Sequence, residues 1–321
     1  MQLAVPDNRL QGIGAILGAM LVLSAQDAFI KSISADYPLH QIILVRASTA
    51  LLLVALFVHW EGGFGILRSN RPGLQALRCL LIVVTNTAFF LGLAALPLAD
   101  AVAIFFVAPV FITALAAPML GERIGPFRWM AVLVGLVGVI VMVRPGTGAF
   151  RPEALLPVSA ALAYALMQML TRRLGVSSKA SALAFYVQLA FLAVSSLVGI
   201  SLGDGRFAGS GHPSLEFLTR PWARPDMAEL ALMVLVGVLN AVGTYLMTQA
   251  YRKGEAAIIA PFEYLALPLS VVWGYLLWSE LPGRTSWIGM ALIAGAGLFL
   301  FYREVLHGRP LAVERPLPRN R

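Results

Sequence analysis

The sequence has few charged residues and a single cysteine. Only 12% of its 321 residues are charged, whereas 59% are hydrophobic, and the mean hydropathy is +0.80. A chain of this composition cannot hide its apolar surface inside a water-soluble globule, so we expect an integral membrane protein. Cys79 alone excludes an internal disulfide, and the four histidines lack metal-ligand spacing. We therefore expect neither a cofactor nor a metal.

The sequence also lacks segments that alternate in hydrophobicity over ten residues, which argues against a transmembrane β-barrel. It contains ten apolar runs that suit helices crossing roughly 30 Å of hydrocarbon. These runs lie near residues 10–33, 39–58, 74–96, 99–120, 128–143, 153–170, 180–202, 229–249, 256–278 and 287–302. The first run is too long for the core of a signal peptide, so it is interpreted as an uncleaved span.

Positive charges in the gaps between the runs predict the orientation of the chain. With the N-terminus inside, 16 Lys and Arg residues lie on the inner side and seven lie on the outer side. The pI near 10.1 is better explained by this asymmetry than by binding to nucleic acid, because the basic residues form no continuous face. Both termini are therefore expected in the cytoplasm.

A motif of glutamate, glycine and tryptophan occurs twice. Glu122, Gly125 and Trp129 return as Glu280, Gly283 and Trp287, all at an offset of 158. Five spans per half is an odd number, so the second half enters the membrane upside down. We predict an all-α integral membrane fold with ten transmembrane helices in two inverted five-helix repeats. The repeats cover 1–145 and 146–303, followed by a disordered cytoplasmic tail at 304–321.

Two further patterns concern the scaffold. Gly135, Gly138 and Gly289 lie in the fifth and tenth spans and permit close helix approach, which is typical of a scaffold or dimer face. The polar segment 203–225 is interpreted as an outer connector, with Trp222 at the membrane interface.

Charges inside the first two spans need a reason, because a charge at the bilayer centre costs on the order of 2.5–3.5 kcal/mol. The first span carries Gln26, Asp27 and Lys31, and the second carries Arg46. Asp27 can pair with Lys31, with Arg46 or with both, and Asp100 falls at a similar depth. Two readings stay open: a structural ion network, or direct contact with an ionised group of a zwitterionic substrate. Lys31 alone can also extend its amine to the headgroups.

Glu263 is the sharpest single feature of the second half. It lies in the ninth span between Pro261 and Pro268, next to Tyr264. Proline leaves a helix carbonyl without its donor, so a carboxylate beside it can face a wet cavity. Substrate binding or proton carriage is one interpretation of Glu263, and a buried pairing with a neighbouring helix is the other.

Three further pairs of side chains share helix faces at a spacing of four residues, near mid-membrane. The pairs are Asn86 with Phe90, Tyr164 with Gln168, and Asn240 with Thr244. Such pairs can line a cavity that offers hydrogen bonds and an apolar wall. Ordinary interhelical hydrogen bonding explains any one of them equally well.

These residues bring the chain close to a known family. Arg46 in the second span, the runs 97–101, 120–122 and 260–264, and Pro109 resemble the EamA-type permeases of the drug/metabolite transporter superfamily. The resemblance covers essentially 10–303. Ser279 precedes Glu280 where the first half has a Gly-Glu pair, which is a small departure.

The resemblance implies a secondary transporter of the bacterial inner membrane that works by alternating access, with a central cavity between the repeats. The expected substrate is an amino acid or a similar small zwitterionic metabolite, and the expected direction of transport is export. An S-adenosylmethionine, nucleobase or cofactor permease is the alternative, and an intramembrane enzyme or lipid-handling protein is a remote one. The expected partners are the substrate, the lipid bilayer and a coupling proton; no nucleic acid is expected, and the protein is a monomer or a homodimer.

Overall fold

The computed structural model describes residues 9–67, 71–120, 125–174, 180–253 and 259–306. Ten helical segments in these ranges are long and apolar enough to cross a membrane. The prediction of an all-α membrane protein with ten spans is therefore confirmed. Glu122 of the repeated motif and the tail from 307 onward lie outside the described residues.

The helices follow the predicted order, with a few short additions. The elements are α1 (Arg9–Ile33), α2 (Leu39–Gly62), η1 (Phe64–Leu67), α3 (Pro72–Ala95), α4 (Leu98–Phe105), α5 (Ala108–Leu120), α6 (Pro126–Val143), η2 (Pro152–Ala154), α7 (Leu155–Leu174), α8 (Ala180–Leu202), α9 (Pro213–Thr219), α10 (Met227–Lys253), η3 (Ala260–Leu265), α12 (Ala266–Trp278) and α13 (Arg284–Leu306). The last helix is longer than the tenth apolar run, because it continues past Tyr302.

Large apolar side chains cover the outside of the bundle. Leu52, Leu197 and Ile200 expose 75%, 65% and 80% of their surface. In water this exposure would promote aggregation, whereas in hydrocarbon it is the favourable arrangement. The outer surface of the helices therefore matches a lipid environment.

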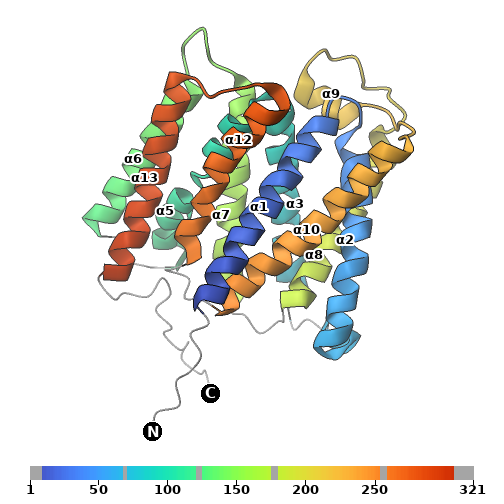
Figure 1. Cartoon of the computed structure of the whole chain (residues 1–321), viewed down its shortest axis with the longest axis horizontal. Coiled ribbons are helices and arrows are strands. Elements are labelled where there is room, and N and C mark those ends of the chain that lie inside the picture. Colours follow the sequence, from blue (N-terminus) through green and yellow to red (C-terminus); the bar gives the residue numbers. More distant parts are fainter. Residues whose placement is uncertain (1–8, 68–70, 121–124, 175–179, 254–258, 307–321) are drawn as a thin grey trace.

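Helices from the two halves of the chain pack against each other in matching pairs (Figure 1). Helix α1 packs along α10, and α3 packs along α7. At one side of the bundle α2 lies against α8, and at the other side α6 lies against α13. The polar residues of α1, α2, α3, α7, α8 and α10 are thereby brought into the interior.

Two of the spans are broken, and proline explains both breaks. The fourth span divides into α4 and α5 just before Pro109, whose ring would clash with the carbonyl of Phe105 in a continuous helix. There the Val107 N–H bonds to the Ile104 carbonyl three residues back, at 3.1 Å. The ninth span begins as the 3₁₀ segment η3 and becomes α-helical before Pro268. The fourth span is thus built from α4 and α5, and the ninth from η3 and α12.

Glycine allows α6 and α13 to approach closely. A Cβ added to Gly289 would lie 2.1 Å from Met142 Cγ and 2.9 Å from the Gly138 carbonyl oxygen. Any larger residue there would push the two helices apart. The expected close approach therefore occurs within one chain, between the fifth and tenth spans.

The connector between α8 and α10 is more structured than expected. It contains α9, whose Ser214 hydroxyl donates to the Leu91 carbonyl of α3 at 2.7 Å and whose Phe217 is buried. The indole of Trp222 donates to the Gly199 carbonyl at 2.9 Å and packs edge-on against His40. These contacts tie the connector to the bundle, and they give Trp222 a packing role that the sequence alone did not indicate.

Candidate functional site

Arg46 of α2 is fully buried between two aromatic rings. Its Cζ lies 4.7 Å from the ring centroid of Phe191 in α8 and 5.5 Å from that of Phe90 in α3. Its Nη1 donates to Asn86 Oδ1 at a long 3.5 Å. Among the residues that the structure describes, its Nε and Nη2 have no hydrogen-bond partner. A buried guanidinium with two free nitrogens can accept an additional anionic ligand.

A chain of amide side chains leads to Asp27, on the α1 side of this arginine. Gln188 of α8 donates to Asn240 of α10 at 3.0 Å, and Asn240 donates to Gln26 of α1 at 2.9 Å. Gln26 in turn donates to the Asp27 carboxylate at 3.2 Å. Asp27 and Arg46 attract each other electrostatically. These residues, together with Asn86, Phe90 and Phe191, form what we call the Arg46 centre.

A second cluster, the Glu263 cluster, lies where η3 meets α7 and α10. Tyr251 donates its hydroxyl hydrogen to Glu263, and Gln168 donates to the Tyr164 hydroxyl oxygen at 3.0 Å. Tyr164 interacts electrostatically with Glu263 and with Arg78 of α3. This cluster can hold a proton or a cation at a carboxylate that a phenol already contacts.

Lys31 does not join the Arg46 centre. Its Nζ donates to the Leu96 carbonyl and lies 3.9 Å from Glu280 Oε2 and 5.2 Å from the ring centroid of Trp278. Of the two partners considered for Asp27, the structure therefore excludes Lys31 and keeps Arg46. The reason is that Lys31 is one turn further along α1, where the end of α3, the end of α12 and the connection after α12 offer it nearer partners.

Two other predicted site residues point elsewhere. Tyr264 is buried against Phe106 and Phe301, and its hydroxyl occupies the space over Gly297 of α13. Thr244 donates to the Asn240 backbone carbonyl at 2.7 Å and lines a separate cavity of about 50 Å³ between α2, α8 and α10. The structure therefore gathers nine of the twelve predicted residues in two clusters and separates Lys31, Thr244 and Tyr264 from them.

Three contributors were not identified from the sequence. Gln188 and Phe191 share a face of α8 at a spacing of three residues, and Tyr251 lies near the end of α10. A glutamine within an apolar run was a usable signal for Gln188. No sequence signal distinguishes Phe191 from other phenylalanines, because its role depends on the position of Arg46.

The described residues contain no group of three or more His, Cys, Asp or Glu side chains that could hold a metal ion. The chemistry available at the two clusters is therefore that of hydrogen bonds, one buried cation, two carboxylates and aromatic faces. Such groups bind and release a polar ligand.

Comparison with known proteins gives consistent relatives. The model of the EamA-like transporter family matches residues 10–144. A riboflavin transporter of Rhizobium johnstonii is 32% identical over 247 residues, covering 77% of this chain and 76% of the relative. An S-adenosylmethionine uptake transporter of Rickettsia felis is 28% identical over 295 residues, covering 92% and 94%. A pseudopaline exporter of Pseudomonas aeruginosa is 27% identical over 283 residues, covering 88% and 93%.

A solved crystal structure has the same fold, with a TM-score of 0.61 at 21% identity over 92% of this chain and 99% of its own. The family model, the relatives and the ten spans agree with one another. The chain therefore belongs to the EamA-like transporters of the drug/metabolite transporter superfamily and is a multi-pass membrane transporter of small molecules, not an enzyme.

Proposed function

We propose that the protein carries a zwitterionic metabolite whose carboxylate binds Arg46. The observation that carries this proposal is a fully buried guanidinium with two nitrogens that find no partner among the described residues. Leaving such donors unsatisfied is costly, and a carboxylate would engage them in the two-pronged geometry that suits arginine. Phe90 and Phe191 flank the site, so they limit competition from water and stabilise the cation.

The remainder of the Arg46 centre suits the other groups of such a ligand. Asp27 can accept hydrogen bonds from an ammonium group, or attract a sulfonium. Gln188 keeps its Oε1 unpartnered among the described residues and begins the amide chain, so it can bind the polar edge of a heterocycle. S-adenosylmethionine combines all of these groups, and relatives named as its uptake transporters cover most of this chain. Amino acid export would use the same ionised end but would leave the amide chain unused.

Riboflavin is the second candidate, favoured by the relative that is 32% identical. Its flavin ring could bind the aromatic faces and the amide chain. It has no carboxylate, so it would not neutralise Arg46. The two candidates therefore differ in how strongly they depend on that residue.

Transport by alternating access between two inverted halves is part of the proposal. Exchanging the halves maps the pair α1–α10 onto α3–α7, and it maps the pairs α2–α8 and α6–α13 onto themselves, as a two-fold repeat requires. The proline breaks occur in the fourth and ninth spans, which are corresponding positions in two halves of five. Interrupted helices in matching positions are typical of transporter binding sites. A coupling proton at Glu263 and insertion in the inner membrane with cytoplasmic termini complete this proposal.

Uptake into proteoliposomes tests the substrate and the site together. Labelled S-adenosylmethionine, riboflavin and threonine would be compared in vesicles with wild-type protein, Arg46→Ala, Arg46→Lys and the outer-loop control Arg206→Gln. We expect S-adenosylmethionine uptake with a KM raised about tenfold or more in Arg46→Ala, because a charge-assisted pair is lost. Arg46→Lys keeps the positive charge but loses the planar guanidinium that forms two parallel hydrogen bonds, so its KM should lie between those of the wild type and Arg46→Ala.

The control should behave like the wild type. The site assignment is wrong if Arg46→Ala elutes as a folded protein and keeps wild-type KM and rate. Riboflavin uptake that is indifferent to Arg46→Ala would select the second candidate, and uptake of threonine alone would select amino acid transport.

A further inference from the structure

A larger cavity lies apart from both clusters, at the end of the bundle opposite the start of α1. Its volume is about 410 Å³, and its walls come from α4, α6, α13 and the 144–151 connection. None of its lining residues belongs to the Arg46 centre or the Glu263 cluster. The volume lies in the range of small-molecule sites. We call it the Asp100 cavity.

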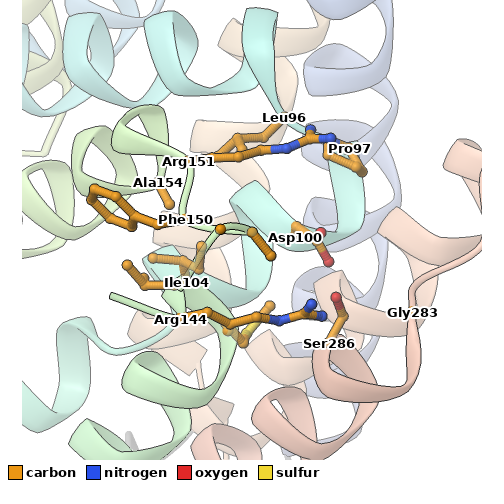
Figure 2. A pocket seen from close by; sticks show the side chains of 14 residues that line it. Leu96, Pro97, Asp100, Ile104, Arg144, Phe150, Arg151, Ala154, Gly283 and Ser286 are labelled. Atoms are coloured by element: carbon orange, nitrogen blue, oxygen red, sulfur yellow. The ribbon is translucent and has the colours of Figure 1, made fainter. Parts of the chain in front are cut away.

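The charged groups that line this cavity are two arginines and one aspartate, so positive charge is in excess. Figure 2 shows Arg144 and Arg151 on two sides of Asp100, with Ser286 beside the Arg144 guanidinium. Ser286 hydrogen-bonds to Asp100, which also interacts electrostatically with both arginines and, more weakly, with Lys31 outside the cavity lining. The other carboxylate oxygen, Oδ1, is buried and has no hydrogen-bond partner among the described residues. The cavity therefore contains two cations, one carboxylate and one free acceptor.

The backbone at Arg144 is also unusual. Arg144 ends α6 with φ of 51°, in the left-handed region where glycine is the common residue. A side chain kept in this conformation is a recognised indication of a functional position. Here the conformation carries a guanidinium into the cavity.

We propose that the Asp100 cavity binds a zwitterion in which a phosphate lies next to an ammonium. Arg144 and Arg151 would bind the phosphate, because guanidinium groups match phosphate geometry. The free Oδ1 of Asp100 would accept a hydrogen bond from the ammonium, and Ile104 and Phe150 would contact the ligand's carbon atoms. This chemistry is that of phosphoethanolamine, supplied either by a phosphatidylethanolamine headgroup or by a free phosphate ester.

Two pairs of probes separate these sources and test the role of Asp100. In the lipid arm, native mass spectrometry measures retention of phosphatidylethanolamine against phosphatidylcholine, which lacks N–H donors. In the free arm, the thermal midpoint in detergent is measured during titration with O-phosphoethanolamine and with phosphocholine. The proteins are the wild type, Arg144→Gln/Arg151→Gln and Asp100→Asn, with Arg206→Gln and Asp204→Asn as matched controls from the outer connector.

We expect the wild type to prefer the ethanolamine probe in at least one arm. The double arginine variant should bind it about tenfold or more weakly, and Asp100→Asn should lose the preference over choline. The controls should match the wild type. A response in the lipid arm alone identifies a headgroup, whereas a response to the free ester identifies a soluble ligand.

The proposal is overturned if neither arm shows the preference, or if the double variant binds as the wild type does. Elution as a single species and the midpoint without ligand report the folding of each variant. If the double variant does not fold, the exposed Arg151→Gln alone provides the same comparison.

Discussion

Arg46 and Asp27 are ionisable residues of the membrane interior that differ in how their polar atoms are satisfied. Asp27 accepts a hydrogen bond from Gln26, whereas Arg46 has one long bond to Asn86 and two nitrogens without a partner in the described part of the chain. A charge at the bilayer centre costs on the order of 2.5–3.5 kcal/mol on insertion scales. A buried charge such as Arg46 whose hydrogen bonds are incomplete is expected at a site that binds a ligand. It is not expected in a structural ion pair, where the partner satisfies the charge.

Glu263→Gln tests the proton proposal at the residue scale. Glutamine can still accept the Tyr251 hydrogen bond, but it cannot take up a proton at neutral pH. We expect uptake into proteoliposomes to lose its response to an imposed pH gradient, while the folded protein elutes normally. Tyr251→Phe is the matched control, because it removes the hydrogen bond and keeps the carboxylate. A Glu263→Gln protein that responds to the gradient as the wild type does would rule out proton carriage there.

At the scale of elements, two local contacts help to set the arrangement. The approach of α6 and α13 depends on Gly138 and Gly289, where there is no space for a side chain. The connector before α10 is held by Glu216 of α9, which accepts hydrogen bonds from the Gly209 and Gly211 amides at 2.8 and 3.2 Å. The first contact depends on close backbone approach and the second on a side-chain carboxylate that binds backbone amides.

Gly289→Ala should destabilise the α6–α13 contact. The added Cβ overlaps Met142 and approaches the Gly138 carbonyl, so we expect a loss of about 1–3 kcal/mol, measured as a lower thermal midpoint in detergent. Gly295→Ala in the same helix meets nothing within 4 Å. It should be neutral or stabilising, since alanine is the better helix former. Equal midpoints for the two variants would contradict this packing.

The Glu216 contact predicts a pH dependence of the connector. Backbone hydrogen bonds from Gly211 and Gly209 hold the pKa of Glu216 below its ordinary value. A carboxylate with a lowered folded-state pKa stabilises above the unfolded value of about 4.3, and this stabilisation is lost as the pH falls through the folded value. The rate of amide hydrogen exchange at Gly209 and Gly211, divided by the intrinsic rate, should therefore rise as the pH falls from about 4.3 through the folded-state pKa of Glu216. Glu216→Gln should remove the acceleration, and an unchanged profile would contradict the assignment.

For the whole molecule, the charge asymmetry of the loops predicts the orientation in the membrane, with both termini in the cytoplasm. Figure 1 places the α9 connector at one end of the bundle and the turn after α2 at the other. In a Cys79→Ser background, Ser210→Cys should react with a membrane-impermeant maleimide in intact cells. Gly65→Cys, in η1, should react only after permeabilisation. The reverse labelling pattern would invert the proposed topology.

The sequence by itself determined the class of fold, the ten spans and the family. These features depend on hydrophobic runs and charge counts. Both are local properties of the sequence, and they determine directly which segments enter the bilayer and in which orientation. Proline was a partial signal for irregular backbone, because Pro261 opens η3 whereas Pro118 lies inside α5. The side chains Asp27, Arg46 and Glu263 were recognisable as unusual for the same local reason, namely their cost in hydrocarbon.

Only the tertiary structure decided which of the unusual residues meet. Lys31 and Asp27 lie on one helix face, yet Lys31 reaches Glu280, more than two hundred residues away in the sequence. Tyr264 neighbours Glu263 and still packs into α13, because one residue of helical or 3₁₀ rotation turns a side chain toward a different neighbour. Phe191 had no local signal, and Asp100 was noted only for its depth, with no indication of the cavity around it. Contacts between distant spans depend on the rotation and crossing of whole helices, and helix packing in the folded molecule sets both.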